Sequence, residues 1–126
     1  MRPETREWVK IAEKDMTAAE ILFGRGIFDM ALFHAQQAVE KMLKALWIER
    51  FSEEPPKTHN IQYMARELGI GHREDISDIA DAYYVTRYPI PGIGTVEYDP
   101  KTAERKMNAA RRVYSAIRKI LSESSE

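Results

Sequence analysis

The amino-acid sequence predicts an all-α protein, an up-and-down bundle of four long antiparallel helices and one short helix. Apolar residues recur at steps of three and four in five segments, and Gly and Pro residues separate these segments. The only strand-like stretch, 95–98, is too short to found a sheet. A chain of 126 residues has the size of one domain, which we expect to span positions 1–126.

The first two segments predict long helices. The first, 5–23, places a carboxylate, Asp15, within an otherwise apolar stripe. The second, 28–51, contains neither Gly nor Pro, so it is the longest uninterrupted helix pattern of the chain. The expected inward residues are Trp8, Ile11, Asp15, Ala18 and Leu22 in the first segment, and Phe28, Leu32, Ala35, Val39, Met42 and Leu46 in the second.

The other three segments complete the predicted bundle. A short helix, 61–68, begins near residues 58–60 and ends at Gly69, where the residue types suit helix caps. A fourth helix is expected at 74–84 and a fifth at 101–121. Residues 89–100 between them form the longest break, and loops of this length are often functional, although a plain crossover would also explain it. The expected inward residues are Ile76, Ile79, Ala80, Tyr83, Ala103, Met107, Ala110, Tyr114, Ile117 and Leu121.

Composition excludes several classes of protein. The chain has no Cys, which excludes a disulfide scaffold, thiolate zinc sites and thiol catalysis, and we expect a cytoplasmic protein. No apolar run approaches the ~20 residues of a membrane span, and no secretion signal is recognised, so no membrane association is expected. His34, His59 and His72 are too scattered for a metal-binding spacing, so neither a metal nor a cofactor is expected.

The net charge of −1 conceals opposite local charges. Segment 101–121 is strongly basic, with Glu104 as its only acid, whereas segment 73–82 is acidic. Solvated charged helix faces explain this pattern, and so does the binding of a charged partner or an anionic ligand.

A polar strip follows the second predicted helix. His34, Gln37, Lys41 and Lys44 lie at helical steps, beside a neighbouring row that contains Gln36 and Glu40. An ordinary solvated helix face favours Glu and Lys at four-residue spacing. Histidine and glutamine are less suited to such a face and better suited to directional hydrogen bonds. Either these side chains satisfy buried partners such as Asp15 or line a dimer seam, or they contact a nucleotide or RNA.

Two further features concern charged groups. An ionisable residue at a core position must be paired, and the sequence offers His34, Lys41 or Arg87 as partners of Asp15. The fourth predicted helix ends in three tyrosines, Tyr83, Tyr84 and Tyr88, around Arg87. Arginine and tyrosine bind phosphates and stack on bases, but they also close helix ends by packing and capping.

These residues together resemble a known family. The run ALFHAQQAVEKMLKA at 31–45, preceded by Trp8 and Asp15 and followed by PKTH at 56–59 and RYP at 87–89, closely resembles the HEPN domain, the higher-eukaryote and prokaryote nucleotide-binding domain. The match spans nearly the whole chain. The resemblance implies an all-α bundle, commonly a homodimer, often paired with a minimal nucleotidyltransferase in a toxin-antitoxin-like two-component system.

The resemblance also supplies three hypotheses of function. The first is a module that binds a nucleotide or RNA, with candidate residues Arg87, Tyr88, His34, Gln37, Lys41, Lys44, Asp15, Thr58 and His59. The second is a metal-independent endoribonuclease. Many HEPN proteins carry an Arg followed after four to six residues by a His, but no histidine follows Arg87, and the spacing of Arg66 and His72 is interpreted as accidental. The third is an interaction subunit that binds no ligand and whose basic last helix meets an acidic partner.

Overall fold

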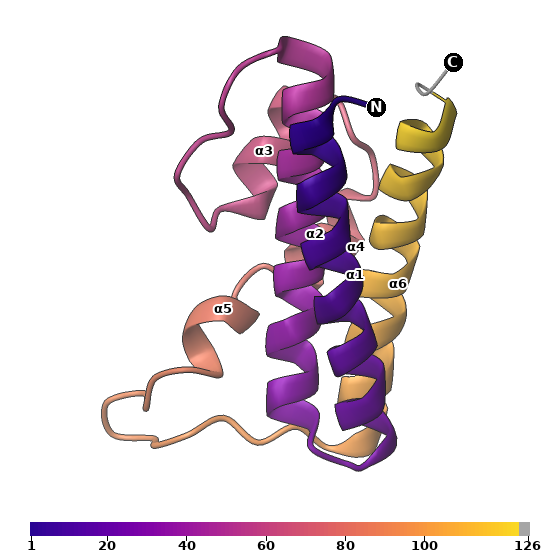
Figure 1. Cartoon of the computed structure of the whole chain (residues 1–126). Helices are drawn as coiled ribbons and strands as arrows, with labels where there is room; N and C mark the ends of the chain where they lie inside the picture. The colour runs from indigo at the N-terminus through magenta and orange to yellow at the C-terminus, as the bar shows by residue number, and fades with distance from the viewer. Residues whose placement is uncertain (124–126) are drawn as a thin grey trace.

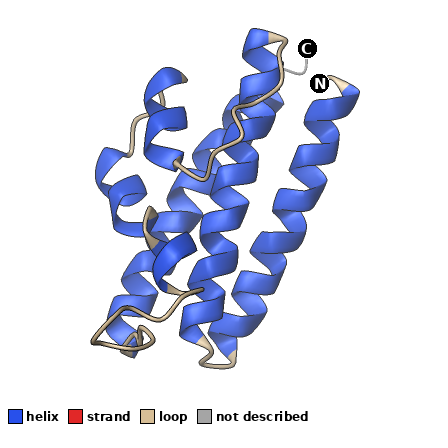
Figure 2. Ribbon diagram, turned by 90° about the vertical axis from the view of Figure 1, so that its left-hand side faces the viewer, coloured by secondary structure: helices blue, strands red, loops and turns tan. Residues whose placement is uncertain are grey.

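The computed structural model describes residues 1–123 as three long and three short helices joined by loops, without a strand (Figures 1 and 2). The all-α fold class is therefore confirmed. Within this range, no helix combines the length and the apolar character that a membrane crossing requires. The helices are α1 (Pro3–Gly24), α2 (Phe28–Phe51), α3 (Ile61–Glu67), α4 (Arg73–Ile79), α5 (Ala82–Val85) and α6 (Pro100–Glu123).

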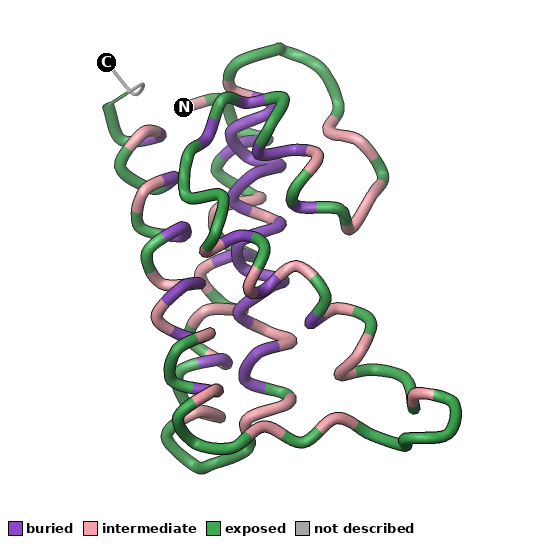
Figure 3. The backbone as a smooth tube through the Cα atoms, turned by 180° about the vertical axis from the view of Figure 1, so that it is seen from behind, coloured by how far each residue is buried: buried purple, intermediate pink, exposed green. Residues whose placement is uncertain are grey.

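Helix α2 forms the centre of the molecule. It is buried almost continuously over residues 35–48, which Figure 3 shows as the most extensively buried stretch of the tube. Helix α1 packs along one side of α2 and α6 along another, while α3 and α5 lie on the side opposite α6 (Figure 1). Full burial of a large apolar side chain such as Leu32, Met42 or Leu46 contributes about 1.5–3 kcal/mol to folding.

Local sequence determines where the helices begin and end. Gly69 adopts a positive φ of 68° after α3, and the amide of Ile70 donates to the carbonyl of Ala65 (2.9 Å). Gly26 has the same role after α1, with a φ of 76°. Both ends are Schellman motifs, which glycine permits because it lacks a Cβ. The side chain of Asn60 accepts from the amide of Tyr63 (3.0 Å) and caps the start of α3, as the sequence predicts.

The expected fourth helix is divided into two short helices. The helix predicted over 74–84 ends at Ile79, and α5 begins at Ala82 after a turn. The two parts pack on different neighbours, because α4 lies against α6 whereas α5 lies against α2. One straight helix does not satisfy both contacts, and periodicity alone does not reveal such a change of partner.

The buried face of α1 also differs from the expected one. Ile11 is 44% exposed, whereas Thr5, Ala12 and Ala19 are buried. The expected and observed faces share Trp8, Asp15 and Leu22, whereas Ile11 lies outside the observed face. Small residues allow α1 to approach α2 closely, so packing selects the alanine face over the larger aliphatic one.

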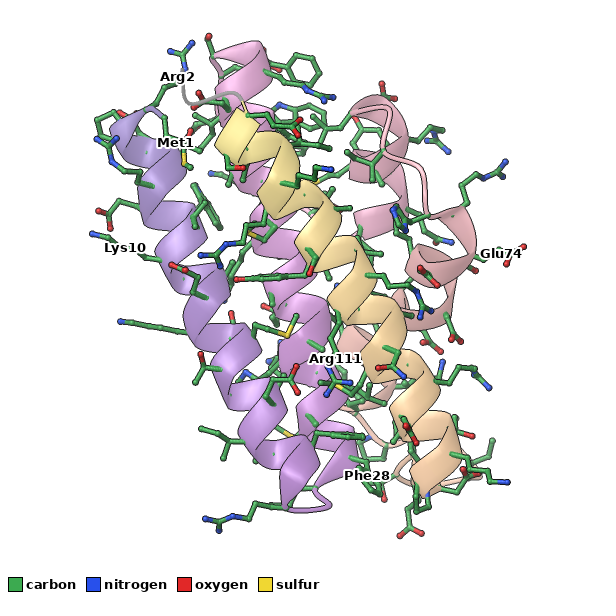
Figure 4. The ribbon with its side chains drawn as sticks, turned by 90° about the vertical axis from the view of Figure 1, so that its right-hand side faces the viewer. Met1, Arg2, Lys10, Phe28, Glu74 and Arg111 are labelled. Atoms are coloured by element: carbon green, nitrogen blue, oxygen red, sulfur yellow. The ribbon has the colours of Figure 1, made fainter. Side chains whose placement is uncertain are left out.

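The arginines of the basic helix α6 form ion pairs within the chain. Arg105 and Arg112 form bidentate ion pairs with Asp78 and Asp75 of α4. Towards α1, Arg111 binds Glu20, as the position of Arg111 between the two helices in Figure 4 indicates. A fourth arginine, Arg118, binds Glu13 of α1. The opposite local charges of the sequence therefore join α6 to the helices beside it.

These ion pairs predict acid-sensitive stability. Hydrogen bonds from Arg112, Arg105 and Arg111 hold the pKa values of Asp75, Asp78 and Glu20 below their usual range. Because the folded-state pKa values are lowered, this stabilisation is complete above the unfolded values of about 4 and is lost as the pH falls through the folded ones. Urea titrations should show a free energy of unfolding that falls between about pH 5 and pH 2.

A double variant separates the contribution of the Asp75 and Asp78 ion pairs to the acid dependence of stability from that of the other carboxylates. Asp75→Asn/Asp78→Asn should lose no more than about 1 kcal/mol per pair at neutral pH and show a weaker acid dependence. Glu67→Gln removes an exposed carboxylate that has no ion-pair partner within residues 1–123, and it should behave as the wild type. An unchanged acid dependence in the double variant would contradict the assignment.

Candidate functional site

Helix α2 carries polar side chains into a buried environment. Glu40 is only 2% exposed, and Gln36, Gln37 and Lys44 are buried as well. Burial of a charge without a partner is costly, so each of these groups requires a specific contact. No buried side-chain nitrogen or oxygen within residues 1–123 lacks a hydrogen-bond partner.

Glu40 holds two cations or potential cations from different segments. The Nζ of Lys44 lies 3.3 Å from one carboxylate oxygen, and the Nδ1 of His59 lies 3.0 Å from the other. Because a carboxylate only accepts hydrogen bonds, His59 donates through Nδ1 and leaves Nε2 as the acceptor in the neutral ring. The Gln36 amide also donates to the His59 carbonyl (3.4 Å). Two residues of α2 therefore fix the loop that precedes α3.

The ring of His59 in turn supports a cluster at the end of α5. It stacks on Tyr83 with ring centroids 3.7 Å apart, and the Tyr83 hydroxyl accepts from Arg87 at 2.6 Å. The Arg87 guanidinium lies over the rings of Tyr83 (4.9 Å), Tyr88 (5.5 Å) and Phe33 (5.6 Å). We call Phe33, His59, Tyr83, Arg87 and Tyr88 the Arg87 cluster.

A second polar group lies between α1 and α2. Asp15 has a side chain that is 13% exposed, and it binds both His34 Nδ1 (2.9 Å) and Lys41 Nζ (2.5 Å). The expectation that Asp15 is paired is confirmed, with His34 and Lys41 as its partners and Arg87 in the separate cluster. An edge contact between His34 and Phe33 (5.2 Å) connects the two groups.

The remaining predicted site residues have structural contacts. Gln37 donates to the amide oxygen of Gln36 (2.8 Å), and Lys44 lies 5.5 Å from the centre of the Trp8 ring. The Thr58 hydroxyl accepts from the amide of Asn60 (3.1 Å) and so belongs to the start of α3. The structure therefore joins His59 with Arg87 and Tyr88, and it joins Asp15 with His34 and Lys41.

The site residues predicted from the sequence omit Phe33, Glu40 and Tyr83. Their positions contain a usable signal, because residues 33, 37, 40 and 44 follow one helical line and Tyr83 precedes Arg87 by one turn. The contact of His59 with Tyr83 has no signal in the sequence, since it joins two segments separated by α3 and α4.

The Arg87 cluster is chemically suited to an anionic, planar ligand. Arg87 is exposed and has no carboxylate partner within residues 1–123, unlike the four paired arginines of α6. A guanidinium held near aromatic rings presents its remaining N–H groups to a phosphate or a base edge. Tyr88 is 55% exposed, so its ring also offers a stacking surface.

The other Arg and His pair of interest, Arg66 and His72, does not form a comparable group. Arg66 lies on α3 over the ring of Tyr63 (5.9 Å). His72 adopts a left-handed conformation before α4, and its ring nitrogen lies 3.4 Å from Asp75. The two side chains contact different neighbours, as expected of a chance spacing.

Comparison with known proteins identifies similar sequences and structures. The sequence profile of the HEPN domain matches residues 5–120. The protein TT1696 from Thermus thermophilus has a TM-score of 0.79 at 22% identity, with 94% of this chain and 98% of that chain covered. ST0689, described as an archaeal HEPN homologue, has a TM-score of 0.72 at 23% identity, with 94% and 97% covered. At these identities the two structures show the fold. A search of proteins with curated functions found no match.

The contact of Asp15 with Lys41 predicts that the two residues are coupled in their contributions to the free energy of unfolding. Asp15→Ala should destabilise the fold by about 1–3 kcal/mol because it leaves Lys41 and His34 partly buried without their acceptor. Chemical denaturation of Asp15→Ala, Lys41→Ala and the double variant should give a coupling of about 0.5–3 kcal/mol. Lys14→Ala, which changes an exposed neighbour of Asp15, serves as the control and should show no coupling with Asp15→Ala. Additive effects of Asp15→Ala and Lys41→Ala would contradict the pairing.

Proposed function

Because the chain belongs to the HEPN domain family, we propose that it binds a nucleotide or RNA through the Arg87 cluster and the adjoining strip of α2. The observation that carries this proposal is the arrangement of Arg87. Its guanidinium is free of carboxylates within residues 1–123 and lies among three aromatic rings. Such a surface accepts a base by stacking and a phosphate by charge-assisted hydrogen bonds.

The neighbouring groups extend the proposed site. Tyr88 stacks on the base, and Arg87 binds the phosphate. His34 and Lys41, held by Asp15, lie beyond Phe33 and offer further donors. Gln37, Lys44 and Thr58 position the site through their contacts with Gln36, Glu40 and Asn60.

The family also supports proposals on partners and location. We propose a cytoplasmic homodimer that acts with a minimal nucleotidyltransferase in a toxin-antitoxin-like system. Light scattering of the purified protein tests the dimer, and a monomer at micromolar concentration would exclude it. Co-purification with a nucleotidyltransferase encoded by the adjacent gene tests the partner, and the absence of a complex would exclude it.

One observation favours a metal-independent endoribonuclease as a second candidate. His59 lies in the Arg87 cluster although it precedes Arg87 in the sequence, and Glu40 orients its ring. A carboxylate, an imidazole and a guanidinium together suit proton transfer from a ribose hydroxyl and stabilisation of a phosphorane-like transition state. His59 thus contacts the same Tyr83 ring as Arg87 and offers an imidazole in place of the downstream histidine of the family motif, which this sequence lacks.

The binding proposal predicts a selective loss in variants. Titration with nucleotides and a short single-stranded RNA in the presence of chelator should show saturable binding by the wild type. Arg87→Ala should weaken it by at least about tenfold, because the charge-assisted hydrogen bonds to the phosphate are lost. His34→Ala should weaken it less. Arg25→Ala removes an exposed arginine at the turn between α1 and α2 and should leave affinity unchanged. Equal affinities in all variants would refute the proposal.

The ribonuclease candidate predicts a different result in the same mixtures. RNA should be cut in chelator, and His59→Ala should reduce the rate of cleavage far more than it weakens RNA binding. Intact RNA after prolonged incubation with the wild type would exclude this candidate and leave the binding function.

A further inference from the structure

A groove of about 710 Å³ lies between α3 and α4, separate from the Arg87 cluster. Tyr63 and Arg66 of α3 form one wall, and Arg73 lies on the other, at the start of α4. The residues that line the groove include no acidic side chain. Its chemistry therefore combines guanidinium groups, an aromatic ring and amide groups.

The groove has a firmly built edge. The Schellman turn at Gly69 reverses the chain after α3, and Ile70 is buried beneath it. The Arg50 guanidinium of α2 donates to the carbonyl of Leu68, which fastens the end of α3 to α2. Arg66 and Arg73 are thus presented from elements that the core holds in place.

The two arginines of this groove form no ion pair within residues 1–123. Arg66 contacts the Tyr63 ring, and Arg73 has no ion-pair partner within residues 1–123. By contrast, each arginine of α6 binds a carboxylate. Arginines that a protein leaves unpaired around one hollow raise the local positive potential and attract phosphate groups.

The groove and the proposed site are adjacent because consecutive residues of the chain belong to them. It begins at Asn60, the residue after His59 of the Arg87 cluster, and follows α3. The seven residues of α3 span about 10 Å at about 1.5 Å per residue. This length corresponds to about three nucleotides at the helical spacing of about 3.4 Å per nucleotide of one strand.

We infer that the ligand is a single-stranded oligonucleotide that occupies the Arg87 cluster with one nucleotide and runs along α3 to place its phosphates on Arg66 and Arg73. This inference rests on the proposed function and specifies its ligand class. A mononucleotide or dinucleotide reaches only the Arg87 cluster, whereas an octanucleotide reaches both sites. The Tyr63 ring beside Arg66 provides a second stacking surface along this path.

The test compares uridine dinucleotide and octanucleotide in wild type and Arg66→Gln/Arg73→Gln. The wild type should bind the octanucleotide more tightly. The double variant should lose at least about tenfold in octanucleotide affinity and keep its dinucleotide affinity. The slope of log affinity against log salt should fall by about 1.4, because each phosphate contact to a single strand contributes about 0.7.

The controls separate this inference from the proposed function. Arg25→Gln removes one arginine charge at the distant α1–α2 turn, and circular dichroism verifies the fold of each variant. Unchanged octanucleotide affinity in the double variant, or an equal loss in Arg25→Gln, would overturn the groove as a binding path. If the groove is overturned in this way but Arg87→Ala weakens dinucleotide binding, the proposed function still stands. If the wild type binds neither ligand, both are overturned.

Discussion

The arrangement of the candidate site depends on the contacts of the Glu40 carboxylate with Lys44 and His59. This carboxylate is almost fully buried in the central helix, so the fold must provide partners that compensate its lost hydration. One partner, Lys44, comes from the next turn of α2, and the other, His59, comes from the loop before α3. The second contact brings a distant loop to α2, and the His59 ring then supports Tyr83, which binds Arg87. A buried charge thus positions an exposed one.

The arginines of the chain include two classes that differ in their contacts. Those of α6 bind carboxylates of α1 and α4 and hold the helices together at the surface. Arg66, Arg73 and Arg87 have no such partners within residues 1–123. Arg66 and Arg87 lie near aromatic rings, and Arg73 lies at the start of α4, beside the groove. Net charge conceals this division, because it is close to zero for the whole chain. The proposed nucleic-acid surface consists of the second class.

Sequence patterns predicted the helices well where the apolar periodicity or the cap residues continue without interruption to the end of the helix. The inward residues of α6 and the bounds of α2 and α3 followed from periodicity and caps. The pattern was wrong for Ile11, where close approach of α1 to α2 selects the alanine face, and for 74–84, where two neighbours divide the helix. In the site, the pairing of Asp15 followed from the cost of a buried charge. The stack of His59 on Tyr83 required the tertiary structure, because no local rule relates a loop residue to a side chain two helices away.

The central claim is that the Arg87 guanidinium is the anion-binding group of this protein. The most direct measurement is NMR of the arginine side-chain Nε–Hε resonances of the labelled protein during titration with a nucleotide. Binding at the proposed site predicts a saturable shift of the Arg87 resonance, while those of Arg105 and Arg112, which are engaged by Asp78 and Asp75, stay in place. A titration that leaves the Arg87 resonance unmoved while others shift would contradict the claim.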